Sequence, residues 1–275
     1  MSYKINKFVS TDKPVASYEK RLSICLESNG FSFSVISVRN ELMEYCEVEC
    51  DTKVPMSDML TTVRGVLSET NLQPFGLKDK ELTVMSRQFV WIPEHLYDAS
   101  RQRTYIEAVG KIDTGMGVYT DFNEEICAHM VFTADSGLVS AFKIAIPGLK
   151  VRCQHSKMVS AETIGGSDMK SVLMVNIRRG ESDYAVICNK KLQISNTFDC
   201  TTFDETLYHA LNLTKQFHLE DALMTVSVSG MVDREQFMQM RGFFPNVTLN
   251  AGRKLRLTVP EMQHIRTYRQ ALLFM

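Results

Sequence analysis

The chain has 275 residues, a formal net charge of −1 and 23% charged residues, which is the composition of a globular protein rather than of a disordered tail or a fibre. This near-neutral charge provides no long-range attraction to nucleic acid or to an acidic membrane surface. A chain of this length buries roughly 70–75% of its unfolded surface, so it needs neither a disulfide nor a metal to hold a core.

The seven cysteines are odd in number and scattered, and no pair has the C-x-x-C spacing of a zinc or redox site. Most lie in apolar runs, which indicates buried, reduced thiols. Residues Met1–Asn6 lack the apolar core of an export signal, and no window is long and apolar enough to span a membrane. We therefore expect a cytoplasmic protein without a membrane span.

The first twenty residues are polar and mixed, and we expect them to form a flexible N-terminal arm, 1–20. Period-two alternation of apolar residues and turn-forming residues then predicts three strands joined by two tight turns. The strands are expected at residues 21–26, 31–36 and 42–48, and the turns at residues 27–30 and 39–40. They form a three-stranded meander.

Between this meander and the middle of the chain, the spacing of apolar residues predicts a mixture of helices and strands. We expect a helix over residues 59–67, a strand over 82–90, a helix that opens at Pro93, and strands from 111 to 146. A polar stretch that ends in Gly165–Asp168 separates the two halves. The first lobe is therefore predicted over 21–168 and the second over 169–275.

The second half repeats the pattern of the first meander. Setting Leu22 on Leu173 uses the same offset in residue number as setting Leu26 on Ile177, and this offset also brings the turns into line. The turns of the second meander are expected at Arg178–Glu181 and Asn189–Lys190. We interpret the agreement as an internal duplication, although two meanders can also agree by chance.

A helix, a strand and a second helix follow the second meander. Residues Thr202–Glu205 form a capping box, in which the threonine oxygen and the glutamate satisfy each other's backbone amides. A strand is expected over 223–229 and a helix over 233–240. The tail is expected to hold a short strand near Leu255 and a terminal helix.

A meander followed by helix, strand and helix, present twice in one chain, resembles the actin-like ATPase fold of actin, the Hsp70 chaperones and sugar kinases. The predicted fold class is therefore α/β: a duplicated actin-like ATPase (ribonuclease H-like) fold with two lobes, each a mixed sheet with flanking helices. The pilus-assembly and cell-division relatives of actin are the most similar in size. More narrowly, Leu22–Ile24 with Asn29–Val35 is similar to the opening of an uncharacterised Bacteroidetes family of unknown function (DUF3822), and this resemblance covers nearly the whole chain.

Active members of that superfamily carry an Asp-x-Gly pattern in the first turn of each meander. The carboxylate positions magnesium, and the glycine lets backbone amides approach the phosphates. Here Glu27 lies three residues before the first glycine, and the second turn, Asn176–Gly180, has no acid before its glycine. Asp183 lies beyond that turn, and the adenosine-side glycine pair is reduced to Gly230 followed by a methionine.

These departures predict a protein with no ATPase or kinase activity, no catalytic residue, no metal site and no cofactor. If nucleotide still binds, the resemblance implies contacts from Asn29, Gly30, Gly180 and Gly230. The leading hypothesis is a catalytically inert actin-like protein that binds another protein or itself. The alternative is an ATP-binding phosphotransferase or ATPase with a rearranged metal site that uses Glu27 and Asp183.

Three further patterns have both a functional and a plain interpretation, and we favour the plain one in each. Arg178–Arg179 could hold phosphates or form a solvated turn. Gly165–Ser167 could be a phosphate loop, but Lys170 falls outside the required spacing, which favours a linker. The methionines between residues 231 and 240 could adapt to a partner protein or fill the core.

Overall fold

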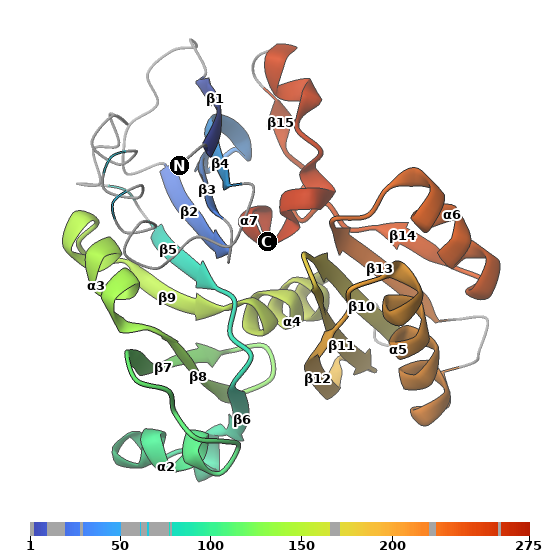
Figure 1. Cartoon of the computed structure of the whole chain (residues 1–275), viewed down its shortest axis with the longest axis horizontal. Coiled ribbons are helices and arrows are strands. Elements are labelled where there is room, and N and C mark those ends of the chain that lie inside the picture. The colour runs from blue at the N-terminus through green and yellow to red at the C-terminus, as the bar shows by residue number, and fades with distance from the viewer. Residues whose placement is uncertain are drawn as a thin grey trace. The chain divides into compact units, whose positions relative to one another are not determined.

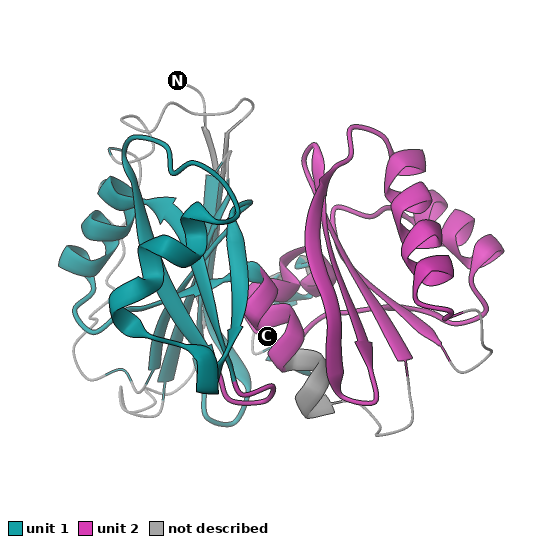
Figure 2. Ribbon diagram, turned by 90° about the horizontal axis from the view of Figure 1, so that it is seen from below, with its two compact units in different colours: residues 1–122, 128–154, 253–265 teal, residues 123–127, 155–252, 266–275 magenta. Residues whose placement is uncertain are grey.

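The computed structural model describes residues 3–9, 20–27, 30–50, 61, 65, 77, 79–165, 171–219, 224–257 and 260–275. The chain divides into two compact units (Figures 1 and 2). Unit 1 comprises residues 1–122, 128–154 and 253–265, and unit 2 comprises residues 123–127, 155–252 and 266–275.

Within the described residues, the main sheet of unit 1 is mixed and has seven strands. They are β1 (Tyr3–Val9), β2 (Lys20–Glu27), β3 (Gly30–Ser37), β4 (Glu41–Cys50), β5 (Asp79–Val84), β9 (Lys150–Cys153) and β15 (Arg256–Leu257). Their order is β1-β4-β3-β2-β5-β9, and β15 pairs with β4. The antiparallel meander predicted from the sequence is confirmed as β2, β3 and β4.

A second, three-stranded sheet is inserted in unit 1 between β5 and β9, and the sequence analysis did not predict it. Its strands are β6 (Phe89–Pro93), β7 (Met116–Asn123) and β8 (Ala128–Asp135), in the order β6-β8-β7. The short helices η2 (Glu94–Leu96), η3 (Ala99–Arg101) and α2 (Gln102–Glu107) follow Pro93. The single strand predicted over 82–90 was wrong, because β5 ends at Val84 and β6 begins in the other sheet.

The strands predicted from 111 to 146 are correct only as far as Asp135. Helix α3 (Ser136–Ala145) follows, and its first turn is capped by the Asp135 carboxylate, which accepts the backbone N–H of Leu138 at 2.7 Å. Leu138 and Phe142 are one helical turn apart and are both buried in the core of unit 1. This core also contains the apolar faces of β2 and β3.

The described residues of unit 2 form a five-stranded mixed sheet. Its strands are β10 (Ser171–Arg178), β11 (Glu181–Cys188), β12 (Lys191–Asp199), β13 (Thr225–Gly230) and β14 (Val247–Leu249), in the order β12-β11-β10-β13-β14. Its helices are α4 (Gln154–Gly165, except the first residue), α5 (Phe203–Gln216), α6 (Arg234–Phe243), η5 (Thr267–Gln270) and α7 (Ala271–Phe274). Helix η4 (Pro260–His264) belongs to unit 1.

Helices α5 and α6 cover one face of the unit 2 sheet, as Figure 2 shows, and their buried residues join its apolar core. The predicted capping box at the start of α5 is confirmed: Glu205 N–H donates to the Thr202 hydroxyl, and the Glu205 carboxylate accepts the Thr202 N–H. Helix α6 is capped in the same way by Asp233. The two helices therefore begin where the sequence predicts.

The two meanders agree in register as well as in order. Leu22 pairs with Val35, and Leu173 pairs with Val186, so the offset found in the sequence holds in both strands of each hairpin. Each meander also has a register shift at the same place, between Val35 and Ile36 in unit 1 and between Val186 and Ile187 in unit 2. Strand β5 pairs with β2 in parallel, as β13 pairs with β10.

Each compact unit is built from several separate segments of the chain. The boundary between two lobes at residue 168 therefore stays a prediction. Helix α4 belongs to unit 2 because it contacts residues of that unit: Asn123 donates to the Ser156 carbonyl at 3.2 Å, and His155 bonds Thr197 at 2.9 Å. Within the predicted arm, residues 3–9 form strand β1 and pair with β4. The helix expected over 59–67 lies outside the described residues, except that Thr61 and Gly65 are helical.

The cysteines at positions 25, 46, 127, 153, 188 and 200 are reduced thiols and not members of disulfides. None of the helices within the described ranges combines the length and apolar character needed to cross a bilayer.

Candidate functional site

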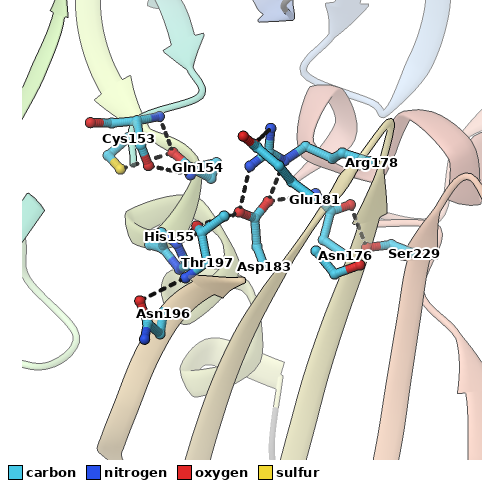
Figure 3. A network of polar contacts seen from close by, with 12 residues as sticks. Cys153, Gln154, His155, Asn176, Arg178, Glu181, Asp183, Asn196, Thr197 and Ser229 are labelled. Atoms are coloured by element: carbon cyan, nitrogen blue, oxygen red, sulfur yellow. Dashed lines mark hydrogen bonds and ion pairs between the residues drawn. The ribbon is translucent and has the colours of Figure 1, made fainter. Parts of the chain in front are cut away.

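A row of polar side chains crosses four neighbouring strands of the unit 2 sheet. The strand register places Ser229 of β13 beside Asn176 of β10, Asn176 beside Asp183 of β11, and Asp183 beside Thr197 of β12. The first three residues are buried, and Asp183 is 0% exposed. The row lies beside the turn that resembles the second phosphate turn of actin-like ATPases, so it is the candidate functional site (Figure 3).

Hydrogen bonds connect this row from one end to the other. Ser229 Oγ donates to Asn176 Oδ1 at 2.9 Å, and Asn176 Nδ2 donates to Asp183 Oδ2 at 3.1 Å. Thr197 Oγ1 donates to Asp183 Oδ1 at 2.8 Å. These donors compensate the cost of placing polar groups in the interior of the unit.

Arg178, the last residue of β10, binds the Asp183 carboxylate through two of its three guanidinium nitrogens. Its Nε lies 2.8 Å from Asp183 Oδ2, and one terminal nitrogen lies 2.8 Å from Oδ1. The other terminal nitrogen lies 2.8 Å from Glu181 Oε2. The arginine therefore joins two carboxylates across the turn, in the bidentate geometry that suits a guanidinium.

All four acceptor positions of Asp183 are occupied by these donors. Each oxygen accepts one N–H from Arg178 and one further hydrogen bond, from Thr197 on Oδ1 and from Asn176 on Oδ2. A carboxylate offers about four lone-pair positions. No acceptor position is left on Asp183 for a magnesium ion or for a water bound to one.

His155, at the start of α4, closes the network from the helix side. The Thr197 hydroxyl gives its hydrogen to Asp183, so its oxygen accepts the N–H of His155 Nε2 at 2.9 Å. This assigns the Nε2–H tautomer to the imidazole. The same nitrogen lies 3.7 Å from Asp183 Oδ1.

Burial and charge shift the pKa values of both groups. Complete burial, opposed by the Asp183 carboxylate and aided by the Arg178 charge, lowers the pKa of His155 to about 4. Burial raises the pKa of Asp183, but the charge and hydrogen bonds of Arg178, with smaller help from His155 and Asn176, hold it well below its usual range. At neutral pH the network therefore contains one buried anion, one arginine cation and a neutral imidazole.

The equivalent row in unit 1 has a different chemistry. The common register places Thr83, Cys25 and Ser32 at the positions of Ser229, Asn176 and Asp183. All three are buried, and none carries a charge in its ordinary state. Glu27 occupies the position of Arg178, so the two carboxylates of the alternative metal hypothesis do not hold equivalent places in the two units.

The glycines proposed for nucleotide contact have separate backbone roles. Gly180 has φ +78° in the turn and has open space where a Cβ would lie. Gly230 has φ +86°, and a Cβ there would overlap the carbonyl oxygen of Ile177, which accepts the N–H of Met231 at 2.7 Å. Gly30 pairs with Glu27 at the first residue of β3, and Asn29 lies outside the described residues.

The other sequence candidates also have definite places. Arg178 belongs to the buried network, and Arg179 is exposed beside it. Met240 is buried in the core of unit 2, whereas Met231 and Met238 are exposed. In the part of the chain that the structure describes, no three His, Cys, Asp or Glu side chains gather in a way that could hold a metal ion.

The sequence analysis found Arg178 and Asp183 but not the rest of the network. His155, Thr197 and Ser229 lie far from the turn in sequence, and only the strand register brings Thr197 and Ser229 beside it. The signal available in the sequence was the predicted hairpin, which already sets Asn176 opposite Asp183.

The sheet order, the paired meanders and the turn beside the polar row define the class of protein: this is an actin-like ATPase fold. Comparison with solved structures supports this assignment. A Bacteroides thetaiotaomicron protein with an actin-like ATPase fold and unknown function has a TM-score of 0.73 and 17% identity, over 84% of this chain and 90% of that chain. Within this class, the chain belongs to the family described as protein of unknown function (DUF3822), which matches residues 10–247.

Two further solved structures share the fold at lower similarity. The PilM–PilN type IV pilus biogenesis complex has a TM-score of 0.53 and 8% identity, over 92% of this chain and 95% of that chain. The ethanolamine utilization protein EutJ from Carboxydothermus hydrogenoformans has a TM-score of 0.51 and 10% identity, over 97% and 93%. No curated protein matches the chain in sequence.

Proposed function

We propose that this protein is a catalytically inert member of the actin-like fold class, and that it works in the cytoplasm by binding another protein. The observation that carries the proposal is the ion pair in the second turn. There the Arg178 guanidinium forms ion pairs with Asp183 and Glu181, at the place where an active relative holds phosphate and metal.

Phosphoryl transfer needs a metal ion to neutralise the phosphates and donors that reach them closely. A metal on Asp183 would have to displace a bidentate arginine from a fully buried carboxylate. Removing one partner of such a buried pair typically costs about 3–5 kcal/mol. This cost is the argument against the alternative phosphotransferase that uses Asp183 and Glu27.

Two observations support a role in protein binding. The PilM–PilN structure is a complex of two proteins, so a protein of this fold is found bound to a partner. On this chain, helix α6 exposes two large apolar side chains, Met238 at 54% and Phe243 at 57%. Exposed apolar side chains on one helix suit a protein contact more than they suit a nucleotide.

The same proposal includes an origin by internal duplication. The support is the common strand order, the common register offset and the bulge at the same place in both meanders. A bulge is a local feature that turn chemistry alone does not impose. Equivalent bulges therefore favour descent from one unit over chance agreement of two meanders.

The test is thermal unfolding of the full chain with and without millimolar ATP and magnesium, followed by a phosphate-release assay. A ligand at a hundred times its dissociation constant stabilises a fold by about 2.7 kcal/mol, which moves the midpoint by a few degrees. We expect no shift and no release, together with a partner complex that forms without nucleotide.

Glu27→Gln is the variant that distinguishes the alternative, with Glu107→Gln on α2 as an exposed control. Magnesium-dependent phosphate release that Glu27→Gln abolishes and Glu107→Gln retains would overturn the proposal. A thermal shift without release would contradict only the absence of nucleotide binding.

A further inference from the structure

Basic side chains gather at one corner of the main sheet of unit 1, at the end of β2 away from the pair of Glu27 and Gly30. Within the described residues this set, which we call the basic corner, comprises Lys20, Arg21, Arg39, Arg253, Lys254 and Arg256. They belong to the start of β2, the turn between β3 and β4, and the start of β15. Strand β2 has eight residues, so the corner lies roughly 23 Å from Glu27.

Strand pairing and hydrogen bonds bring these three segments together. Lys20 pairs with Ser37, the last residue of β3. Arg21 donates from one terminal nitrogen to Asn40 Oδ1 at 3.3 Å, and the backbone N–H of Arg256 donates to the Asn40 carbonyl at 2.8 Å. Asn40 therefore joins the start of β2 to β15, and the corner has a defined backbone frame.

The basic corner carries more positive charge than its carboxylates neutralise. Arg256 lies 3.5 Å from the Glu41 carboxylate, and Asp79 attracts Arg21. In the described part of the chain, no carboxylate lies within ion-pair distance of Lys20, Arg39, Arg253 or Lys254. The corner is therefore a local excess of positive charge on a chain whose formal net charge is −1.

Two of the arginines lie close enough to repel each other. Burial, aided by the Arg253 charge and opposed by Glu81 and Asp79, lowers the pKa of Arg21. Arg253 itself is exposed. A ligand with negative charge would interact favourably with both guanidinium groups and offset their repulsion, because a surface potential of one sign concentrates groups of the other sign.

The corner also exposes an apolar side chain, which distinguishes between classes of anion. Val38, beside Arg39 in the turn, is 47% exposed. A peptide can place an aliphatic side chain on Val38 and a carboxylate on the neighbouring guanidinium, which suits the planar geometry of both groups. A phosphate backbone has no apolar group for this position. The near-neutral net charge of the chain also provides no long-range attraction to nucleic acid.

From these observations we infer that the basic corner of unit 1 binds an acidic segment of a partner protein. Carboxylates of that segment face the arginines, and an apolar side chain of the segment contacts Val38. This inference rests on the proposed function, since it names the chemistry of the partner that the proposed function leaves open. The surface belongs to unit 1, whereas the polar row belongs to unit 2.

The experiment is fluorescence anisotropy of the full chain with two labelled ten-residue peptides. One peptide has glutamate at every second position and a leucine at its centre, and the other has glutamine in place of each glutamate. At low salt we expect the glutamate peptide to bind about tenfold more tightly or better, and we expect added salt to weaken it. Equal affinities for the two peptides, or binding that salt leaves unchanged, would overturn the inference.

Charge reversals locate the surface. Arg39→Glu and Arg253→Glu are each expected to weaken the glutamate peptide about tenfold, because each removes one charged contact. Both side chains are exposed, so neither substitution is expected to unfold the unit, and thermal unfolding checks this. Lys215→Glu, an exposed reversal on α5 of unit 2, changes the net charge equally and is the matched control. An equal loss in Lys215→Glu would show that the peptide senses only net charge, and would contradict the inference.

Two further measurements separate the possible outcomes. A ten-nucleotide single-stranded DNA that binds more tightly than the glutamate peptide would assign the corner to nucleic acid and overturn the inference. ATP turnover would remove the proposed function whatever the peptide does. A protein that neither binds the peptide nor turns over ATP would lose this inference alone.

Discussion

At the scale of single residues, the Arg178–Asp183 pair joins a cation to a carboxylate that is 0% exposed. Asp183 is completely buried, and Arg178 is its one cationic partner in the network described above. Lysine could supply the charge but not the planar fork that meets both oxygens. The identity of residue 178 therefore matters for stability as much as for the chemistry of the turn.

Arg178→Ala is expected to lower the free energy of unfolding by about 3–5 kcal/mol, because it leaves a buried carboxylate without its counter-ion. Urea unfolding followed by circular dichroism measures this loss. Arg179→Ala, the exposed neighbour, is the matched control and should stay within about 0.5 kcal/mol of the wild type. Equal effects of the two substitutions would refute the assigned role of Arg178.

His155 gives the fold a definite pH dependence. Its pKa is about 4 in the folded protein and 6.5 as a reference value, so between these pH values the unfolded chain binds the proton and the folded chain does not. Stability is therefore full above about pH 6.5 and falls as the pH drops toward 4, by roughly 3 kcal/mol in total. The folded pKa of Asp183 is also depressed, so its contribution to stability is lost only as the pH falls below the ordinary pKa of 3.8.

His155→Gln should flatten the dependence of unfolding free energy on pH between 4 and 6.5. The glutamine retains a donor for Thr197 but carries no titratable proton. Denaturant unfolding at a series of pH values measures the slope, and His95→Gln, an exposed histidine, is the control. An unchanged slope in His155→Gln would show that other groups cause the acid sensitivity.

At the scale of elements, the end of β13 depends on the close approach of two backbones. Gly230 combines a positive φ with the carbonyl of Ile177 at the place where a Cβ would lie, whereas Gly180 has only the positive φ. Gly230→Ala is expected to cost about 2–4 kcal/mol and to weaken the pairing of β13 with β10, and Gly180→Ala about 1 kcal/mol. Unfolding midpoints and hydrogen exchange of β13 distinguish the two, and equal losses would disprove the steric argument.

The elements also show what the sequence could predict. Both meanders were predictable because turn residues fix the hairpin register; the second turn of unit 2, for example, has positive φ at both Asn189 and Lys190, as a type I′ turn requires. Helix α3 was missed because its apolar residues continue a strand-like run, and the Asp135 cap that ends the strand was not considered. Strand β1 was missed although Tyr3 and Ile5 alternate with polar residues.

At the scale of the whole molecule, the fold was predictable and most of the site was not. The order of meander, helix, strand and helix is local along the chain, so the spacing of apolar and turn residues is enough to predict it. The polar network is not local: His155, Thr197 and Ser229 come from three separate elements, and their meeting depends on tertiary packing. The inserted sheet of β6, β7 and β8 was hidden for a similar reason, since its strands pair out of chain order.

The position of β15 has a consequence for how the protein is made. Strand β15 pairs with β4 through Arg256 and Leu257, so unit 1 includes residues that leave the ribosome after nearly all of unit 2. A nascent chain therefore holds unit 1 incomplete until residues 253–265 have been made. Because contacts between distant residues slow folding, the pairing of β15 with β4 is expected to be a late step of unit 1, and truncation before residue 256 should leave that unit unfinished.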